Sequence, residues 1–354
     1  MRNLTQNNFR RILVVNVNWA GDVVFSSAVF EALHEAYPQA RISCLAAPRV
    51  QEVLESIPFV HEIISYEERG RHKNPWGKLK LIGGLKKKKF DAAFLLHRSL
   101  TRALLIFLAG IPVRVGYNTK GRGVFLTRRV PEPSGSLHRQ DYYLNLLEAF
   151  GIPVKKRESL LAVDLESTKQ MNQRLCEFSI EEKDFLLVLN PGGNWDLKRW
   201  PKENWTKLIE LFLKEFHGQS NFKIILSGSE KDISLVDEIL APLHLNNYSK
   251  VANLTGKWTL KELITFLKRS NLLISADSGP LHMASSVGTK TIGIFGPTSP
   301  DVTGPRGSGS SQILKVDVGC NRSPCYYLQC PENTCMRAVT VQDVFGLVRE
   351  WISY

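Results

Sequence analysis

The sequence predicts an α/β protein with two doubly wound domains, each built on a parallel β-sheet covered by helices. Short apolar runs alternate with helix-like stretches along the chain, which is typical of parallel sheets with helical crossovers. The alternation stops near Gly151 and starts again near Phe185. A length of 354 residues suits two domains of roughly 150–200 residues each.

The elements follow from the apolar pattern and from the glycines and prolines that interrupt it. In the first half, predicted strands and helices alternate: strands 12–17, 41–46, 62–65, 91–96 and 114–116, and helices 26–36, 50–56, 99–109 and 139–150. The second half continues with strands 185–189, 223–226, 272–275 and 291–294, and helices 167–178, 202–216, 260–269 and 341–351.

The connection between the domains is predicted in residues 152–166, which hold Pro153, a basic cluster and mixed polar residues. We therefore place the domains at 1–160 and 161–354. The last helix, about 341–354, is a candidate to pack back on the first domain. Ligands of doubly wound sheets bind beyond the carboxyl ends of the strands, so the loops there are where chemistry is expected.

The positive charge of the chain is concentrated in one segment. The net charge is +12, yet Arg69 to Arg129 holds 16 Lys and Arg and a single acid, Asp91. Such a segment is either a solvated surface or a contact for an anionic membrane, a phosphorylated substrate or a nucleic acid. Within "NPWGKLKLIGGLKKKK", apolar side chains interleave with the lysines, which suits a peripheral contact with lipid headgroups. Its glycines make a mobile basic loop an equal alternative to a helix.

The sequence gives no sign of a secreted or membrane-spanning protein. The polar, basic start at 1–11 is followed by an apolar segment that Asn16, Asn18 and Asp22 interrupt, so a signal peptide is not expected. The longest apolar run, 103–113, is interrupted by Gly110 and Pro112 and falls short of the roughly 18 residues that span a bilayer. We expect a cytoplasmic protein.

The stretch "NVNWAGDVVFSS", residues 16–27, has the strand–turn–helix form of a nucleotide-binding loop with an unusual composition. Its turn has one glycine, Gly21, followed directly by an acid, Asp22. A carboxylate at a helix N-terminus repels a phosphate. Asp22 is therefore expected to perform a different task.

Two loops of the second half have the composition of a phosphate site. "NPGGNWDLKRWP" places Gly192, Gly193 and Lys198 after a strand, where backbone N–H groups and an ammonium suit a phosphate or diphosphate. The spacing is neither that of a P-loop nor that of a dinucleotide fingerprint. A tight turn with surface basic residues explains the same pattern.

"SADSGPLHMASSVG" delivers Asp277, Ser278 and Gly279 to the start of a helix that carries His282. The helix start suits a phosphate, and Asp277 can accept hydrogen bonds from sugar hydroxyls. Helix capping by Asp277 or Ser278 is the simpler interpretation and is compatible with ligand binding. We assign no chemistry to the following loop, "FGPTSP".

Four cysteines recur at a constant interval, C-x4-C-x4-C-x4-C, at Cys320, Cys325, Cys330 and Cys335. They can form a structural metal site, although zinc-binding pairs are usually closer together. Reduced or redox-variable structural cysteines are the alternative, because a reducing cytosol disfavours disulfides. Nothing supports a catalytic thiol.

These segments together resemble glycosyltransferase family 9, the bacterial heptosyltransferases of lipopolysaccharide core assembly. The resemblance covers nearly the whole chain, with four anchors in order: "NWAGDVVFSSAVFEALHEAYPQARI", "AGIPVRVGY", "NPGG…KRWPKENW" and "DSGPLHMA…GIFGPTSPD". The "W-x-GD" and "KRWP" segments are closer to the second-type enzyme of the family than to the first.

The resemblance implies a GT-B fold, in which two Rossmann-like domains face a central cleft. It implies an inverting transfer of L-glycero-D-manno-heptose from ADP-heptose to the lipopolysaccharide inner core, a Kdo-lipid A acceptor, with no metal and no cofactor. The first domain would hold this phosphorylated acceptor on the cytoplasmic face of the inner membrane, against its anionic inner leaflet. No nucleic-acid partner is expected.

The resemblance also assigns roles to residues. Asp22 matches the catalytic base, Lys198 the lysine that meets the diphosphate, and Trp258 the adenine contact. The donor-binding residues are Gly192, Gly193, Asn194, Lys198, Trp258, Asp277, Ser278, Gly279 and His282. Gly193 and Asn194 replace hydroxyl residues of the first-type enzyme, so backbone amides and the Asn194 amide remain for phosphate binding. We expect Arg98, Arg102 and Arg122 to bind the anionic acceptor.

Three rival functions remain open at this stage. A related transferase could use another nucleotide sugar for a different surface glycan, because sequence pattern defines a phosphate site better than a sugar site. A nucleotide-sugar 2-epimerase of the same fold has no lipid acceptor, and the basic segment argues against it. A non-enzymatic binder of membranes or nucleic acids leaves Asp22, Lys198 and Asp277 without a role.

Overall fold

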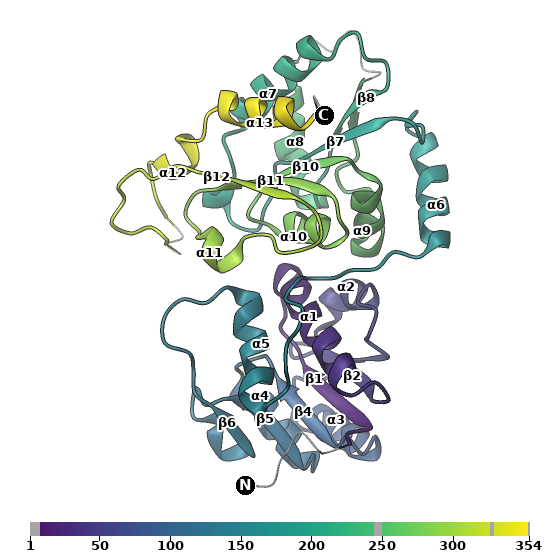
Figure 1. Cartoon of the computed structure of the whole chain (residues 1–354), viewed down its shortest axis with the longest axis vertical. Coiled ribbons are helices and arrows are strands. Elements are labelled where there is room, and N and C mark those ends of the chain that lie inside the picture. The colour runs from purple at the N-terminus through teal and green to yellow at the C-terminus, as the bar shows by residue number, and fades with distance from the viewer. Residues whose placement is uncertain (1–7, 244–249, 326–328, 353–354) are drawn as a thin grey trace. The chain divides into compact units, whose positions relative to one another are not determined.

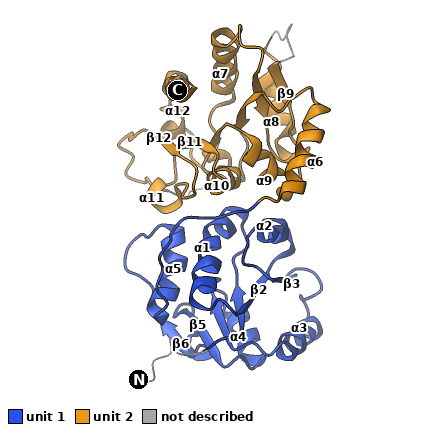
Figure 2. Cartoon of the chain, turned by 45° about the vertical axis from the view of Figure 1, so that its right-hand side comes forward, with its two compact units in different colours: residues 1–162 blue, residues 163–354 orange. Residues whose placement is uncertain are grey.

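The computed structural model describes residues 8–243, 250–325 and 329–352. The chain divides into two compact units, residues 1–162 and 163–354 (Figure 2). The sequence-based boundary at residue 160 lies in the same connecting segment, between the last helix of unit 1 and the first helix of unit 2.

Unit 1 alternates strands with helices, as the apolar pattern predicts (Figure 1). Its elements are β1 (Arg11–Val15), α1 (Ala20–Ala36), β2 (Arg41–Ala46), η2 (Pro48–Val50), α2 (Gln51–Glu55), β3 (Glu62–Ser65), α3 (Pro75–Lys87), β4 (Ala92–Leu95), α4 (Leu100–Leu108), β5 (Val113–Tyr117), η3 (Arg122–Phe125), β6 (Arg128–Val130) and α5 (Arg139–Phe150). The described residues form one six-stranded sheet in the order β3-β2-β1-β4-β5-β6, with every pair parallel.

Unit 2 has the same architecture. Its elements are α6 (Leu165–Cys176), β7 (Phe185–Asn190), η4 (Asp196–Lys198), α7 (Lys202–Glu215), β8 (Phe222–Leu226), η5 (Glu230–Asp232), α8 (Ile233–Leu240), β9 (Val251–Asn253), α9 (Leu260–Arg269), β10 (Leu272–Ala276), α10 (Gly279–Ser286), β11 (Lys290–Phe295), α11 (Pro300–Thr303), β12 (Ser311–Lys315), α12 (Thr334–Arg337) and α13 (Val341–Ile352). Its described strands form a second six-stranded parallel sheet, β12-β11-β10-β7-β8-β9.

Both sheets have the strand order of a Rossmann fold. Counted from the first strand of each unit, the order is 3-2-1-4-5-6 in both sheets. The first and fourth strands therefore lie side by side and their following helices start toward opposite faces, which creates a binding crevice at their carboxyl ends. In unit 1 this switch point lies beyond β1 and β4, and in unit 2 beyond β7 and β10.

The central strands owe their positions to their apolar composition. Residues Ile12 to Val15 of β1 and Leu186 to Leu189 of β7 are fully buried, as expected for parallel strands covered on both faces. Each unit has its own hydrophobic core, centred on Trp200, Trp205 and Phe212 in unit 2 and on Leu13, Leu95 and Ile106 in unit 1.

The last helix belongs to the core of unit 2. Val341, Val344 and Val348 of α13 are buried in that core, and α13 contacts α7. The sequence allowed this helix to pack back on the first domain. The apolar face of α13 packs within unit 2, and its contact with the first domain stays a prediction. Residues 353 and 354 of the predicted helix lie outside the described residues.

The segment predicted with equal weight as a basic loop forms the regular helix α3. Asn74 caps it by accepting a hydrogen bond from the Gly77 N–H, and Pro75 occupies the first turn, where proline is tolerated. Leu81 and Leu85 anchor its inner face in the core of unit 1. These anchors outweigh the low helix propensity of its glycines.

Candidate active site

The turn after β1 brings Asp22 into the first turn of α1. Asn16 is fully buried and fixes this turn through its side chain. Its side-chain NH2 group donates to the Ser26 hydroxyl at 2.9 Å, and its side-chain oxygen Oδ1 accepts from the Val17 N–H at 2.8 Å. The partial positive charge of a helix N-terminus stabilises a carboxylate. The N-terminus of α1 therefore stabilises the negative charge of Asp22, although that charge would repel a phosphate bound at the same place.

Arg102 also stabilises the turn that carries Asp22. Its guanidinium donates to the backbone carbonyl of Asn16 at 2.7 Å and to the side-chain oxygen of Asn18 at 2.8 Å. The Arg102 side chain has no exposed surface. The expectation that Arg102 binds the acceptor directly does not fit this position, because a guanidinium enclosed by the protein cannot reach an external anion. Arg102 supports the loop that carries Asp22.

The two other predicted anion-binding arginines differ from each other. Arg122 is fully buried and donates to the carbonyls of Tyr117 and His97; burial lowers its pKa to about 10. The expectation that Arg122 binds the acceptor therefore does not fit its position either, and Arg122 supports the backbone around it. Arg98 lies at the surface in an ion pair of 2.7 Å with Glu132. Only Arg98 of the three has the exposure that an acceptor contact requires.

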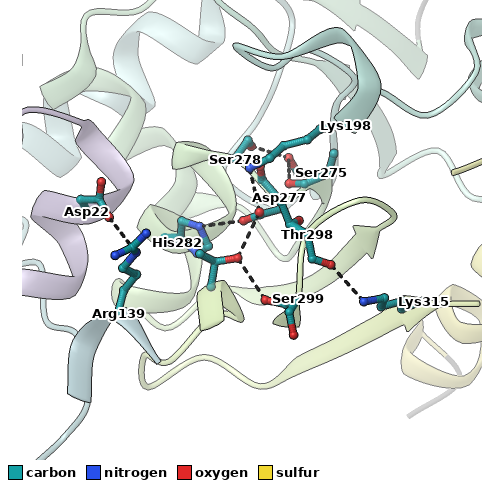
Figure 3. Close-up of polar contacts among 12 residues, drawn as sticks. Asp22, Arg139, Lys198, Ser275, Asp277, Ser278, His282, Thr298, Ser299 and Lys315 are labelled. Atoms are coloured by element: carbon teal, nitrogen blue, oxygen red, sulfur yellow. Dashed lines mark hydrogen bonds and ion pairs between the residues drawn. The ribbon is translucent and has the colours of Figure 1, made fainter. Parts of the chain in front are cut away.

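Helix α5 supplies two partners of Asp22 that sequence reasoning missed. The Tyr143 hydroxyl donates to Asp22 Oδ1 at 3.3 Å, and Arg139 Nε lies 4.0 Å from the same oxygen (Figure 3). Burial, and then the charge of Asp22, raises the pKa of Tyr143 well above its ordinary value, so Tyr143 remains a donor at neutral pH. The Asp22 side chain is 28% exposed, which leaves it accessible to a substrate.

In unit 2, the glycine pair after β7 has two separate tasks. A Cβ on Gly192 would lie 2.4 Å from the carboxylate carbon of Asp232, so glycine is required for this close approach. Arg199 fixes the turn by donating to the Gly193 carbonyl at 2.9 Å, and it lies 3.5 Å from Asp232. Gly193 has open space where a Cβ would be, so packing within the protein does not require glycine at this position.

The loops after β7 and β10 meet at a buried charge cluster around Asp277. Lys198 Nζ lies 2.8 Å from Asp277 Oδ2, and His282 Nε2 lies 3.3 Å from Asp277 Oδ1 (Figure 3). The Thr303 hydroxyl also donates to Oδ2, at 3.1 Å. Burial alone would raise the pKa of Asp277, but the hydrogen bond and charge of His282, with those of Lys198, hold that pKa well below its ordinary value.

This arrangement defines what Asp277 can do. Both carboxylate oxygens already have partners within the protein, so the expected direct contact with sugar hydroxyls is not supported by the geometry. Asp277 instead holds Lys198 and His282 in place. The Lys198 side chain is 24% exposed and can offer its ammonium to an anion. Thr303, at the end of the short helix α11 that follows the loop "FGPTSP", also contributes to the cluster.

Ser278 and Gly279 lie at the beginning of α10, beside this cluster. Ser278 is the N-cap residue, and its hydroxyl lies 2.9 Å from that of Ser275 rather than capping the helix. Asn194, next to the glycine pair, is exposed. The residues predicted for diphosphate binding thus come from loops at the carboxyl ends of adjacent strands, β7 and β10.

Trp258 is used in packing. Its ring lies under the guanidinium of Arg174, 4.6 Å away, and stacks on Phe266 with centroids 5.5 Å apart. These contacts join α6 to α9. The adenine contact of Trp258 remains a prediction.

The four regularly spaced cysteines lie between β12 and the end of α12. They are free thiols, and among the described residues no group of His, Cys, Asp or Glu has a metal-binding arrangement. The Cys325 N–H donates to the Pro297 carbonyl at 2.7 Å, which attaches this segment to the loop after β11. Residues 326–328 lie outside the described part of the chain.

Two Rossmann-like units in one chain, each with charged side chains at its switch point, are the architecture of the glycosyltransferases of the GT-B fold. Residues 78–335 match the family model for glycosyltransferase family 9 (heptosyltransferase). The chain belongs to this family and is a transferase.

Similar proteins agree with this assignment. Lipopolysaccharide heptosyltransferase 2 of Escherichia coli strain K12 is 27% identical over 319 residues, covering 88% of this chain and 90% of the relative. The structure of E. coli ADP-heptose lipopolysaccharide heptosyltransferase II has a TM-score of 0.78 at 24% identity, covering 97% and 98% of the two chains. A family 9 glycosyltransferase structure from Veillonella parvula has a TM-score of 0.85 at 22% identity, covering 99% of each.

Proposed function

We propose that the protein transfers L-glycero-D-manno-heptose from ADP-heptose to the inner core of lipopolysaccharide, on a Kdo-lipid A acceptor, with inversion at the anomeric carbon. The observation that carries the proposal is the Lys198–Asp277–His282 cluster at the switch point of unit 2. It presents a cation beside the start of α10, as the departing diphosphate of a nucleotide sugar requires. The names of the relatives support the sugar and the acceptor.

The donor is assigned to unit 2. Lys198 and the backbone N–H groups around Gly193 and Gly279 would bind the diphosphate, with Asn194 adding a side-chain amide. Such groups stabilise the charge that develops on ADP as the glycosidic bond breaks. Asp277 keeps Lys198 in position, so its contribution to donor binding is indirect.

The acceptor is assigned to unit 1. The Asp22 carboxylate would take the proton of the acceptor hydroxyl while that oxygen forms the new bond to the anomeric carbon and ADP leaves with the bonding electrons. Tyr143 and Arg139 hold the carboxylate toward this task. We predict that the reaction requires no metal and no cofactor.

The test is a transfer assay with ADP-heptose and a heptosylated Kdo-lipid A acceptor in detergent, analysed by mass spectrometry for one added heptose. Asp22→Asn should reduce the rate by about 100-fold or more, with ADP affinity unchanged. Glu35→Gln, on the same helix, is the matched control. Activity should persist in EDTA if no metal is used. An active Asp22→Asn variant would contradict the base assignment.

A transferase for another nucleotide sugar remains the alternative. The same assay with ADP-glucose and UDP-sugars distinguishes the two, because turnover of one of these without turnover of ADP-heptose excludes the heptosyl assignment.

We also propose that the enzyme works on the cytoplasmic face of the inner membrane, against its anionic leaflet, since its acceptor is a membrane glycolipid. Among the described residues, no helix is both long enough and apolar enough to cross a bilayer.

A further inference from the structure

One face of unit 1 combines exposed apolar side chains with positive charge. Of the twelve exposed large hydrophobic residues in the described chain, six fall between residues 69 and 129. These six are Trp76, Leu79, Leu100, Phe107, Leu108 and Val124. They lie on α3, α4 and η3, which are neighbours because α3 contacts α4 and α4 contacts η3. We name this surface the α3–α4 face; Figure 2 shows both helices in unit 1.

Part of the positive charge of the segment between residues 69 and 129 is paired, at Lys88 with Glu62 and at Arg98 with Glu132, but the fold leaves the lysines of the α3 helix itself without neutralising acids among the described residues. The one acid of the segment, Asp91, accepts the backbone N–H groups of Arg10 and Arg11 at 2.7 and 2.8 Å. In the described part of the chain, no carboxylate pairs with Lys80, Lys86 or Lys87 of α3, although all three are exposed. The face therefore attracts an extended anionic partner.

The outer surface of α3 also lacks side chains where the fold has room for them. Gly83 and Gly84 are exposed, a Cβ at either position would meet nothing within 4 Å, and neither has a positive φ. Because a side chain would fit at both positions, packing within the protein does not require glycine there. Glycine is also unfavourable inside a helix, so these two residues need another explanation. Spacing of three and four places Trp76, Lys80, Gly83 and Lys87 along one outward stripe. A bare helix surface between a tryptophan and lysines lets a flat partner approach closely.

We propose that the α3–α4 face docks on an anionic phospholipid bilayer. Trp76, with 79% of its surface exposed, and Leu79, with 55%, enter the headgroup region, while the lysines of α3 contact lipid phosphates. Interfacial binding of this kind combines buried apolar area with attraction to anionic lipid. The aliphatic exposed residues favour a bilayer over a nucleic acid, whose bases are bound on aromatic stacking platforms.

This inference rests on the proposed function only for its biological purpose, the presentation of a membrane-held acceptor. Its test uses no sugar donor. Purified protein is floated with vesicles of phosphatidylglycerol and phosphatidylethanolamine, and in parallel with vesicles of phosphatidylcholine alone. Variants are Trp76→Ser/Leu79→Ser and Lys80→Glu/Lys87→Glu. Matched controls in unit 2 are Leu165→Ser and Lys207→Glu/Lys214→Glu, at exposed positions.

The wild type and the controls should bind the anionic vesicles, with binding that weakens as salt is added. Each cation near an anionic bilayer strengthens binding about fivefold, so reversing two charges should weaken it by more than about 25-fold. Removing Trp76 and Leu79 should weaken it comparably. Equal binding to neutral vesicles, or α3 variants that bind like the controls, would overturn the proposal.

A second readout separates docking from catalysis and from misfolding. The α3 variants should keep the wild-type melting temperature and the wild-type rate on a detergent-solubilised acceptor, but lose rate on acceptor embedded in anionic vesicles. Vesicle binding without any heptosyl transfer would remove the proposed function and leave the docking surface intact. Loss of rate on both acceptors would count against a docking role.

Discussion

The ammonium of Lys198 lies 2.8 Å from the carboxylate of Asp277, whose side chain is only 3% exposed. The two residues lie on loops that follow adjacent strands, and the pair lies beyond the carboxyl ends of the first and fourth strands of unit 2, which are hydrogen-bonded side by side. A buried acid that also contacts His282 fixes the direction of the lysine. The ammonium that we propose to bind the donor diphosphate is thus held in position by the fold itself.

Asp277→Asn should impair catalysis through Lys198. Loss of the negative partner frees the lysine, so we expect kcat/KM to fall by about 100-fold and ADP affinity, measured by calorimetry, to fall with it. The matched control is Asp237→Asn on the exposed surface of α8. An Asp277→Asn enzyme with normal ADP affinity would show that the carboxylate does not position the cation.

The same substitution has a defined pH dependence. Since the pKa of Asp277 is lowered in the folded protein, its stabilising contribution is present above the ordinary carboxyl pKa and is lost as the pH falls toward the folded value. The difference in free energy of unfolding between wild type and Asp277→Asn should be constant above about pH 5 and shrink below about pH 4. Urea denaturation across this range measures it.

Tyr143→Phe should affect the rate more than substrate binding. The Tyr143 hydroxyl donates to Asp22, and loss of one hydrogen bond worth about 1 kcal/mol should lower kcat by roughly fivefold. The acid limb of the pH–rate profile should move to higher pH, because the carboxylate loses a contact that favours its charged form. Tyr142→Phe is the neighbouring control. An unmoved profile would assign Tyr143 to packing alone.

Arg102 is predicted to stabilise the turn that carries Asp22. Arg102→Met removes the donors to Asn16 and Asn18 and leaves a buried carbonyl unpaired, so the free energy of unfolding should fall by about 2–3 kcal/mol. Arg102→Lys should recover little of this, because an ammonium cannot reproduce the planar fork. Arg98→Met, at the surface, should cost little stability. Chemical denaturation separates these outcomes.

His97 should make the protein sensitive to mild acid. Burial, reinforced by the charges of Arg102 and Arg122, lowers the pKa of His97 to about 4. Below the ordinary histidine pKa of about 6.5 the unfolded chain takes up a proton that the folded protein refuses, so stability is lost as the pH falls from about 6.5 to 4. The slope should approach about 1.4 kcal/mol per pH unit. His97→Gln should remove this component, as denaturation at a series of pH values would reveal.

The predictable part of the fold is the part with a strong apolar signal. The sequence predicts the central strands β1, β4, β7 and β10 because both of their faces are buried, so that each is a continuous apolar run. The edge strands β6, β9 and β12 escaped prediction because they are short and partly exposed, and so carry no continuous apolar run. For α3, two buried leucines decided the outcome against local glycine propensity.

The active site divides in the same way. Asp22, Lys198 and Asp277 stand in compact motifs that begin or end an element, and local sequence identifies them. Tyr143 is separated from Asp22 by 121 positions and Thr303 from Asp277 by 26, and only tertiary packing brings each pair together. Sequence also could not distinguish the enclosed guanidinium of Arg102 from the exposed one of Arg98, because both precede or begin the same helix.

Both sheets repeat one strand order, yet the loop after the first strand carries an acid in unit 1 and leads to a lysine in unit 2. We propose that the two units share the transfer reaction: Asp22 of unit 1 removes a proton from the acceptor, and Lys198 of unit 2 binds the negative charge of the departing diphosphate. Because each unit has a core of its own, we expect that the loops proposed to bind the donor in unit 2 can be exchanged without disturbing Asp22 in unit 1. The fold itself would then allow the sugar donor to change while the acceptor side stays the same.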